Sequence, residues 1–362
     1  MNRRSFVAGM IGGVALGGIG IWGWRASTGS MSEYTRYAAA QRTDLPQDPP
    51  LHDLIRYATL APNSHNTQPW RCAVGKNSIG LLPDFSRSTP AVDPDNHHLF
   101  VSLGCAIETL RIAAEATGRP GDVNVEETGA ASYVFSSGMP RPGPMFAAIP
   151  RRQSTRTDYD RRPVLAADLE TLARAAAVPG TGLVLITERP QLDRIRDLVV
   201  AGNDAQMADR AYLAELKHWL RFNPRTAMAS GDGLFSASSG NPVLPDALGS
   251  RAFDLVFTAN AENNKYRRWI DSSAGIAVFV GDREDKTHWI AVGRACQRFA
   301  LAATSLGLRC SFVNQPVEVA RFRPELAEIV GASGKRPDLV MRFGYGPVTP
   351  FSLRRPVRAV LL

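Results

Sequence analysis

Apolar residues recur every three or four positions in two long segments of the chain, residues 97–120 and 286–309. This spacing predicts an amphipathic helix in each segment. A glycine near the end of each, Gly118 or Gly307, predicts where the helix stops. Short continuous apolar runs bounded by polar or turn residues predict strands at 79–84, 275–282, 310–314 and 338–346.

The two predicted helices align with one another without a gap. Gly104 aligns with Gly293 and Gly118 aligns with Gly307, and both pairs lie 189 positions apart. Each helix also follows a predicted strand. This agreement favours an internal repeat, with a first half at 31–148 and a second at 149–362, divided where "GMPRPGPM" interrupts the pattern.

The composition is that of a globular protein. The chain has 362 residues, 44% hydrophobic and 21% charged, which is long enough for two domains. The net charge of +8 is spread out with no basic run of five, so we expect no nucleic-acid partner. Because 37 of the 42 basic residues are arginine, whose fork suits phosphate, a phosphorylated ligand is worth considering.

The cysteines and histidines do not form a metal-binding motif. The four cysteines include no CxxC pair, so structural zinc is not expected and any disulfide depends on the fold. His97 and His98 are adjacent, and adjacent helical side chains point about 100° apart, which does not suit a shared metal. We therefore expect no metal.

The N-terminus resembles an export signal. Arg3 and Arg4 precede Phe6 and an apolar, glycine-rich stretch that carries no charge until Arg25. Residues 1–30 are accordingly interpreted as a twin-arginine-type signal read by the Tat export machinery, or as a short uncleaved anchor. Either interpretation places the protein in the periplasm or on the outer side of the inner membrane, and the fate of the signal is open.

Two polar segments are candidates for ligand binding. The loop "APNSHNTQPW" (61–70) has more donors and acceptors than a turn requires. In "RRQSTRTDYD" (151–160), Arg152, Ser154 and Arg156 alternate, so an extended backbone turns them to one side. Taken alone, this segment is either a phosphate clamp or a solvated basic strand.

These segments resemble motifs of the FMN-dependent nitroreductase family. The R-x-S-x-R run at 152–156 is similar to the family's flavin-phosphate motif, and the loop at 61–70 to its A-P-S-x-x-N-x-Q-P-W loop. "LGLRCSFVNQP" (306–316) and "RFGYGPVTPFSLRRPV" (342–357) resemble its strand beside the flavin and its C-terminal region. The resemblance implies an α+β fold with central antiparallel or mixed sheets flanked by helices.

The order of the motifs differs from that of the ordinary family, in which the arginine motif precedes the polar loop and two subunits build each site. Here the loop comes first, so the halves are complementary. The chain resembles the double-length Acg-like subgroup, which implies a pseudo-dimeric monomer with one flavin between its halves.

The resemblance implies specific cofactor contacts. It assigns the phosphate and ribityl chain to the arginine motif and the loop, further charge to Arg354 or Arg355, and the isoalloxazine ring to the strand at 310–314. The cofactor-binding residues so implied are Arg152, Ser154, Arg156, Pro62, Asn63, Ser64, Asn66, Ser311, Asn314, Arg354 and Arg355. For Gln68 and Trp70, core packing is an equal alternative.

The implied function is an oxidoreductase that reduces nitroaromatic, quinone or similar small-molecule acceptors through flavin N5, with NAD(P)H as a possible donor. The flavin carries the hydride chemistry, so no catalytic side chain is assigned. The alternative is a flavin-sequestering protein with little turnover. The Gly/Ser-rich stretch at 230–245, within an insertion at about 228–250, is a lid, a mobile gate or a disordered insertion.

Overall fold

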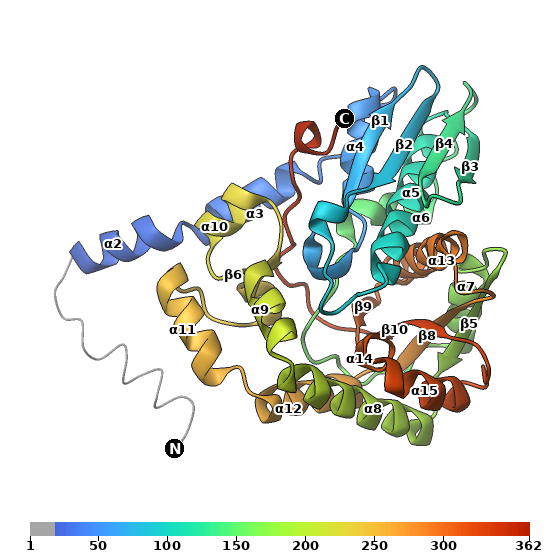
Figure 1. The fold of residues 1–362 in the computed structure, drawn as a ribbon. Helices are drawn as coiled ribbons and strands as arrows, with labels where there is room; N and C mark the ends of the chain where they lie inside the picture. Colours follow the sequence, from blue (N-terminus) through green and yellow to red (C-terminus); the bar gives the residue numbers. More distant parts are fainter. Residues whose placement is uncertain (1–18) are drawn as a thin grey trace.

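The computed structural model describes residues 19–362 (Figure 1). Most of the expected export signal therefore lies outside the described residues, and only its end is seen, in helix α2 (Ile19–Thr28). Within the described part, no helix has both the length and the apolar character needed to cross a membrane.

The described residues form two four-stranded antiparallel sheets. The first has the order β1-β2-β4-β3, and its strands are β1 (Trp70–Val74), β2 (Ser78–Pro83), β3 (Gly121–Val125) and β4 (Ala131–Phe135). The second has the order β5-β8-β10-β9, and its strands are β5 (Thr181–Ile186), β8 (Gly275–Gly281), β9 (Arg309–Phe312) and β10 (Pro337–Gly344). The predicted α+β class is confirmed.

The two helices of the predicted repeat, α5 (His97–Ala116) and α13 (Lys286–Ser305), pack against each other between the sheets (Figure 1). Their aligned glycines meet at the crossing: a Cβ on Gly104 would lie 2.1 Å from the Ile290 carbonyl oxygen and 2.9 Å from the Gly293 Cα. Only glycine permits so close an approach. The predicted duplication agrees with this arrangement and stays a prediction.

The core is continuous across both sheets because α5 packs on the first sheet, α13 packs on the second, and the two helices pack on each other. One apolar cluster includes Ile79 of β2, Leu103 of α5, Phe299 of α13 and Phe279 of β8. All residues of β8 and β10 are buried, which explains their continuous apolar runs, whereas β3 alternates and has one face in solvent.

The remaining helices pack beside α5 and α13, on the far face of the second sheet, or at the rim. They are α3 (Met31–Ala40), α4 (Leu51–Thr59), α6 (Pro144–Ala148), α7 (Ala166–Ala175), α8 (Arg189–Ala208), α9 (Arg210–Trp219), α10 (Pro224–Ser230), α11 (Asp246–Val256), α12 (Ala259–Asp271), α14 (Gln315–Glu318) and α15 (Arg323–Ile329). Helices α8 and α12 lie side by side beneath the second sheet in the view of Figure 1.

The stretch at 230–245 is ordered, so its interpretation as a disordered insertion is wrong. Strand β7 (Leu234–Phe235) pairs in parallel with β6 (Leu220–Arg221), and a 3-10 turn follows at Ser236–Ser239. Asp232 anchors the stretch through ion pairs with Arg87 and Arg221. Arg87 lies far away in sequence, so the local composition did not indicate this order.

Candidate functional site

The polar loop at 61–70 has an unusual backbone. His65, Asn66 and Gln68 have φ values of +46°, +56° and +54°, in the left-handed region that residues other than glycine seldom adopt. Such strain persists only where surrounding contacts hold it, and it is concentrated at functional sites. The loop therefore has a more demanding role than connecting α4 to β1.

The amide side chains of this loop hold two other segments of the chain. Asn66 Nδ2 donates to the carbonyl oxygens of Gly233 and Leu353, and its Oδ1 accepts from Arg354. Gln68 donates to the Gly231 carbonyl and accepts from the backbone N–H of Arg355. Part of the loop's hydrogen-bonding capacity is thus satisfied within the protein. These hydrogen bonds fix the loop against the 231–233 stretch and the C-terminal segment.

A cavity of about 40 Å³, here called the arginine cavity, opens beside the loop. It is several times larger than one water needs on the same measure (~10–15 Å³). It is lined by four arginines, Arg42, Arg152, Arg156 and Arg354, together with Pro62, Asn63, Asn66, Gln153, Ser154, Leu234, Pro350, Phe351 and Ser352. The prediction that Asn66 and Arg152 face one cavity is confirmed.

The four guanidinium groups have no anionic partner within residues 19–362. No carboxylate forms an ion pair with any of them, and none appears among the charges that influence their pKa values. Burial and the charge of Arg152 lower the pKa of Arg42 to about 9. Burial, Arg42 and Arg152 lower the pKa of Arg354 well below its usual value. Uncompensated buried charges are unfavourable, so the cavity is suited to an anion that restores the balance.

The arginines differ in how much of their hydrogen-bonding capacity the protein uses. Arg354 donates to the carbonyl oxygens of Thr59, Leu60 and Ala61 as well as to Asn66. Arg152 donates to Leu60 alone among the described residues, at 2.8 Å. The remaining donors of Arg152 are therefore available to a ligand.

Arg342 of β10 positions the segment that carries the arginine motif. Its guanidinium donates to the carbonyl oxygens of Thr155 and Thr157, at 3.0 and 2.7 Å, and stacks 4.0 Å from the ring of Tyr159. Arg342 is fully buried. The extended backbone at 152–156 is thus held from behind while Arg152, Ser154 and Arg156 line the cavity, as their alternation predicts.

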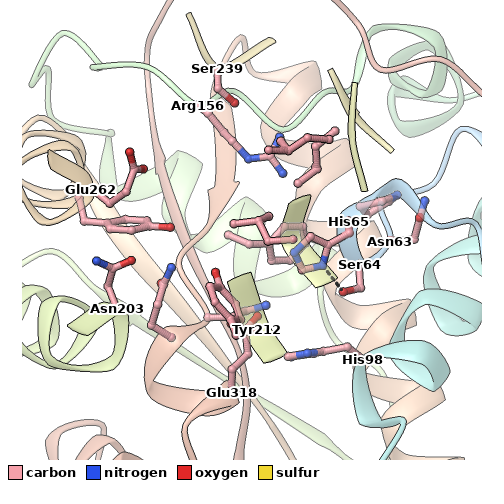
Figure 2. Close-up of a pocket in the computed structure, with 18 of the residues that line it drawn as sticks. Asn63, Ser64, His65, His98, Arg156, Asn203, Tyr212, Ser239, Glu262 and Glu318 are labelled. Carbon is pink, nitrogen blue, oxygen red and sulfur yellow. Dashed lines mark hydrogen bonds between the residues drawn. The ribbon is translucent and has the colours of Figure 1, made fainter. Parts of the chain in front are cut away.

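A larger cavity of about 220 Å³ adjoins the arginine cavity, and Pro62, Asn63, Arg156 and Leu234 line both. Aromatic and polar side chains share its wall, which includes Ser64, His65, His98, Asn203, Tyr212, Phe257, Glu262, Lys265, Tyr266, Trp269, Phe312, Asn314, Gln315 and Glu318. In Figure 2, Arg156 and Ser239 lie at one end, and Glu318, His98 and Tyr212 lie at the other. We call it the large cavity.

Nine of the eleven predicted site residues line these cavities. They are Arg152, Ser154, Asn66 and Arg354 in the arginine cavity, Pro62, Asn63 and Arg156 in both, and Ser64 and Asn314 in the large cavity. The Asn314 side chain is also tied to the fold, because its Oδ1 accepts from Val340 N.

Two predicted site residues, Ser311 and Arg355, line neither cavity. Successive strand residues point to opposite faces, so Phe312 of β9 borders the large cavity while Ser311 is buried on the other face. Arg355 turns away and donates to the Ala359 carbonyl. Of the two C-terminal arginines, Arg354 is therefore the one that faces the cavity.

Arg42 belongs to the site but was missed in the sequence, where it follows α3 in a stretch without a motif. The far wall of the large cavity, from α9, α12 and α14, was missed as well. Its α14 residues had a signal nearby, since Gln315 lies within the recognised "SFVNQP" run and Glu318 lies two residues after it. Trp70 is fully buried, in agreement with core packing.

Asp93, His97 and His98 bring potential ligand atoms within 4.8 Å of one another, closer than the sequence suggested. Their contacts serve the fold. Asp93 accepts the backbone N–H groups of His98 and Leu99 at the start of α5, and His97 Nε2 lies 2.8 Å from Asp338. Burial and then Arg336 lower the pKa of His97 to about 3. A nearby arginine also opposes the binding of a cation.

Comparison with known proteins identifies the family. The model of the nitroreductase family matches residues 149–345, more than half of the chain. The chain therefore belongs to the nitroreductase family, whose members are oxidoreductases.

The chain is similar to two proteins of Mycobacterium tuberculosis over most of its length. It is 27% identical over 318 residues to "Putative NAD(P)H nitroreductase Rv3131", covering 86% of this chain and 89% of that protein. It is 23% identical over 325 residues to "Putative NAD(P)H nitroreductase acg", covering 84% and 93%. A solved nitroreductase with bound FMN from Desulfitobacterium hafniense aligns with a TM-score of 0.38 and 14% identity, covering 59% of this chain and 96% of that one.

Proposed function

We propose that the chain binds FMN, with the phosphate in the arginine cavity and the ring system in the large cavity. The observation that carries this proposal is the set of four buried or half-buried arginines without a carboxylate partner in residues 19–362. A phosphate dianion supplies the missing charge, and guanidinium groups bind phosphate in bidentate geometry.

Different residues of the chain would hold different parts of FMN. Arg42, Arg152 and Arg354 would hold the phosphate, with Ser154 and Asn63 near the ribityl chain. Asn66 is a positioning residue because its amide is already bonded to Gly233, Leu353 and Arg354. Phe312, Tyr266 and Trp269 offer apolar surface to a ring. Bound FMN would supply hydride transfer, and the protein supplies binding and orientation.

The proposed reaction is the reduction of a small organic acceptor such as a quinone or nitroaromatic, with NAD(P)H as the candidate donor. Purified protein should be yellow or should take up added FMN, and its flavin should bleach under anaerobic conditions with NADH or NADPH. It should recover its colour when a quinone is added. A colourless protein that does not take up FMN would refute the proposal.

A second candidate function is FMN storage with little turnover. The observation that favours it is the ordered stretch at 231–239, which borders the large cavity and is anchored by the pairs of Asp232 with Arg87 and Arg221. A wall fixed in this way would limit access by a bulky nicotinamide donor. Flavin that is bound but not bleached by NADH or NADPH, yet is reduced by dithionite, would favour storage over turnover.

The proposal includes a duplicated chain with one FMN between its halves, in the manner of the Acg-like subgroup. Support comes from the aligned glycines at the α5–α13 crossing and from the site itself, which joins the loop of the first half to the arginines of the second. Such a chain would act as a monomer.

Export through the twin-arginine route is also proposed, from the residues at the N-terminus. Replacement of Arg3 and Arg4 by lysine should then leave the protein inside the cell. A periplasmic or membrane fraction that is unchanged in this variant would contradict export by that route.

A further inference from the structure

Glu318 is a carboxyl group without a cationic partner at the end of the large cavity remote from the arginines (Figure 2). Within the described residues no lysine or arginine lies in ion-pair range of it. Gln206 Nε2 donates to its Oε2 at 2.6 Å, and no hydrogen bond within residues 19–362 involves its Oε1. One carboxyl oxygen is thus held by α8 while the side chain lines a ligand cavity.

The titratable groups around Glu318 come from several elements. They are His98 of α5, Asp93 before it, Tyr212 and Glu215 of α9, and Glu262, Lys265 and Tyr266 of α12. Lys265 is 2.6 Å from Glu262, so its charge is already paired. Asp93 and Glu215 accept backbone N–H groups.

These surroundings favour a neutral carboxyl. Burial is the largest influence on the pKa of Glu318, and it raises that pKa. The nearby carboxyl groups of Asp93 and Glu215 raise it further, whereas His98 and the hydrogen bond from Gln206 lower it. Burial lowers the pKa of His98 to about 4, and its Nε2 is buried without a hydrogen-bond partner among the described residues. Near neutral pH the imidazole is therefore neutral, and burial shifts Glu318 toward its protonated form.

We propose that the Glu318 carboxyl is the proton donor to the acceptor that is reduced in the large cavity. This rests on the proposed function. A quinone becomes a hydroquinone by gaining a hydride and a proton. Bound reduced FMN would supply the hydride, the Glu318 carboxyl would give up the proton, and the resulting carboxylate would regain a proton from solvent. Glu318 is then a catalytic residue in addition to the flavin, because it supplies the proton that accompanies the hydride.

The first test does not depend on activity. Infrared spectra of the protein without flavin should contain a C=O band of a protonated carboxyl near neutral pH, and Glu318→Gln should remove part of it. Glu262→Gln is the matched control, because that glutamate lines the same cavity but is paired with Lys265. A band that is identical in wild type and Glu318→Gln overturns the proposal.

The second test separates proton donation from flavin reactivity. Photoreduced holoprotein is mixed with benzoquinone, which needs a hydride and a proton, or with ferricyanide, which needs only electrons. Glu318→Gln should slow benzoquinone reduction by about 10²–10⁴-fold and leave ferricyanide reduction unchanged. Equal slowing of both acceptors, or of neither, overturns the proposal.

A second variant keeps the carboxyl in place. Wild-type benzoquinone reduction should decline as pH rises through the pKa of Glu318. Gln206→Met removes the hydrogen bond that favours the carboxylate, so this decline should move to higher pH, and an unmoved decline argues against Glu318. Failure to bind FMN would refute the proposed function alone, because the infrared test needs no flavin.

Discussion

Arg152→Met should weaken FMN binding without destabilising the chain that lacks FMN. The Arg152 guanidinium donates to the Leu60 carbonyl alone among residues 19–362, and it lies close enough to Arg42 and Arg354 to lower the pKa of both. Its removal takes away one hydrogen bond to the protein and relieves repulsion between buried cations. An uncompensated buried charge is unfavourable, so its replacement by an apolar side chain of similar volume should not destabilise the chain.

The loss of affinity follows from the contact that disappears. A hydrogen bond to a charged group contributes about 1.5–3 kcal/mol. The dissociation constant for FMN should therefore rise by about 10–150-fold. Riboflavin lacks the phosphate, so its affinity should be the same in wild type and Arg152→Met, and the preference for FMN over riboflavin should shrink by the whole of that factor.

Quenching of flavin fluorescence on titration into protein stripped of flavin measures both affinities, and urea unfolding measures the stability. Arg151→Met is the matched control, because Arg151 is the exposed neighbour whose side chain donates to the Ala147 carbonyl. If Arg152→Met binds FMN as Arg151→Met does, the phosphate lies elsewhere. If FMN and riboflavin lose affinity equally, Arg152 supports the cavity and does not bind phosphate.

Three further predictions concern the scaffold. Asn66→Ala should lower the free energy of unfolding by about 2–4 kcal/mol in urea titrations. The variant loses the hydrogen bonds to Gly233, Leu353 and Arg354 and places alanine at a left-handed φ of +56°. Asn124→Ala, at an exposed position, should have little effect in the same titrations. Gly104→Ala should destabilise the protein by about 1–3 kcal/mol or more through the clash with Ile290. Gly182→Ala is the control, because its Cβ would lie 3.8 Å from the Val280 carbonyl oxygen. Equal melting temperatures of the two variants would contradict the close crossing of α5 and α13. Burial raises the pKa of Asp338 to about 6 from 3.8, so its contribution to stability is present below about pH 4 and is lost as pH rises to 6. Relative to Asp338→Asn, the wild type should thus lose roughly 2 kcal/mol between pH 4 and pH 7, and an equal difference at both pH values would count against this.

The sequence predicted those elements whose signals are local. Burial of β8 on both faces requires a continuous apolar run, and the close crossing of α5 and α13 requires their paired glycines, so both features are visible in the sequence. The alternation of Arg152, Ser154 and Arg156 was also enough to predict that they face one side, because every second side chain of an extended backbone points the same way.

The features that were missed depend on contacts between distant segments. Whether Ser311 or Phe312 faces the ligand depends on which side of β9 the cavity lies, and the other walls of that cavity come from α5, α9 and α12, which are distant in sequence. Arg42 enters the site because the segment after α3 runs beside the C-terminal segment, where it donates to the Ser352 carbonyl. The order of the 231–235 stretch depends on Arg87.

We infer that one FMN binds in each chain, between the polar loop and the arginine motif. The most direct measurement is the ratio of bound FMN to chain, with the mass of the complex determined by sedimentation. We expect one FMN for each monomeric chain. A chain that binds no FMN, or a dimer that shares a flavin between two copies, would contradict it.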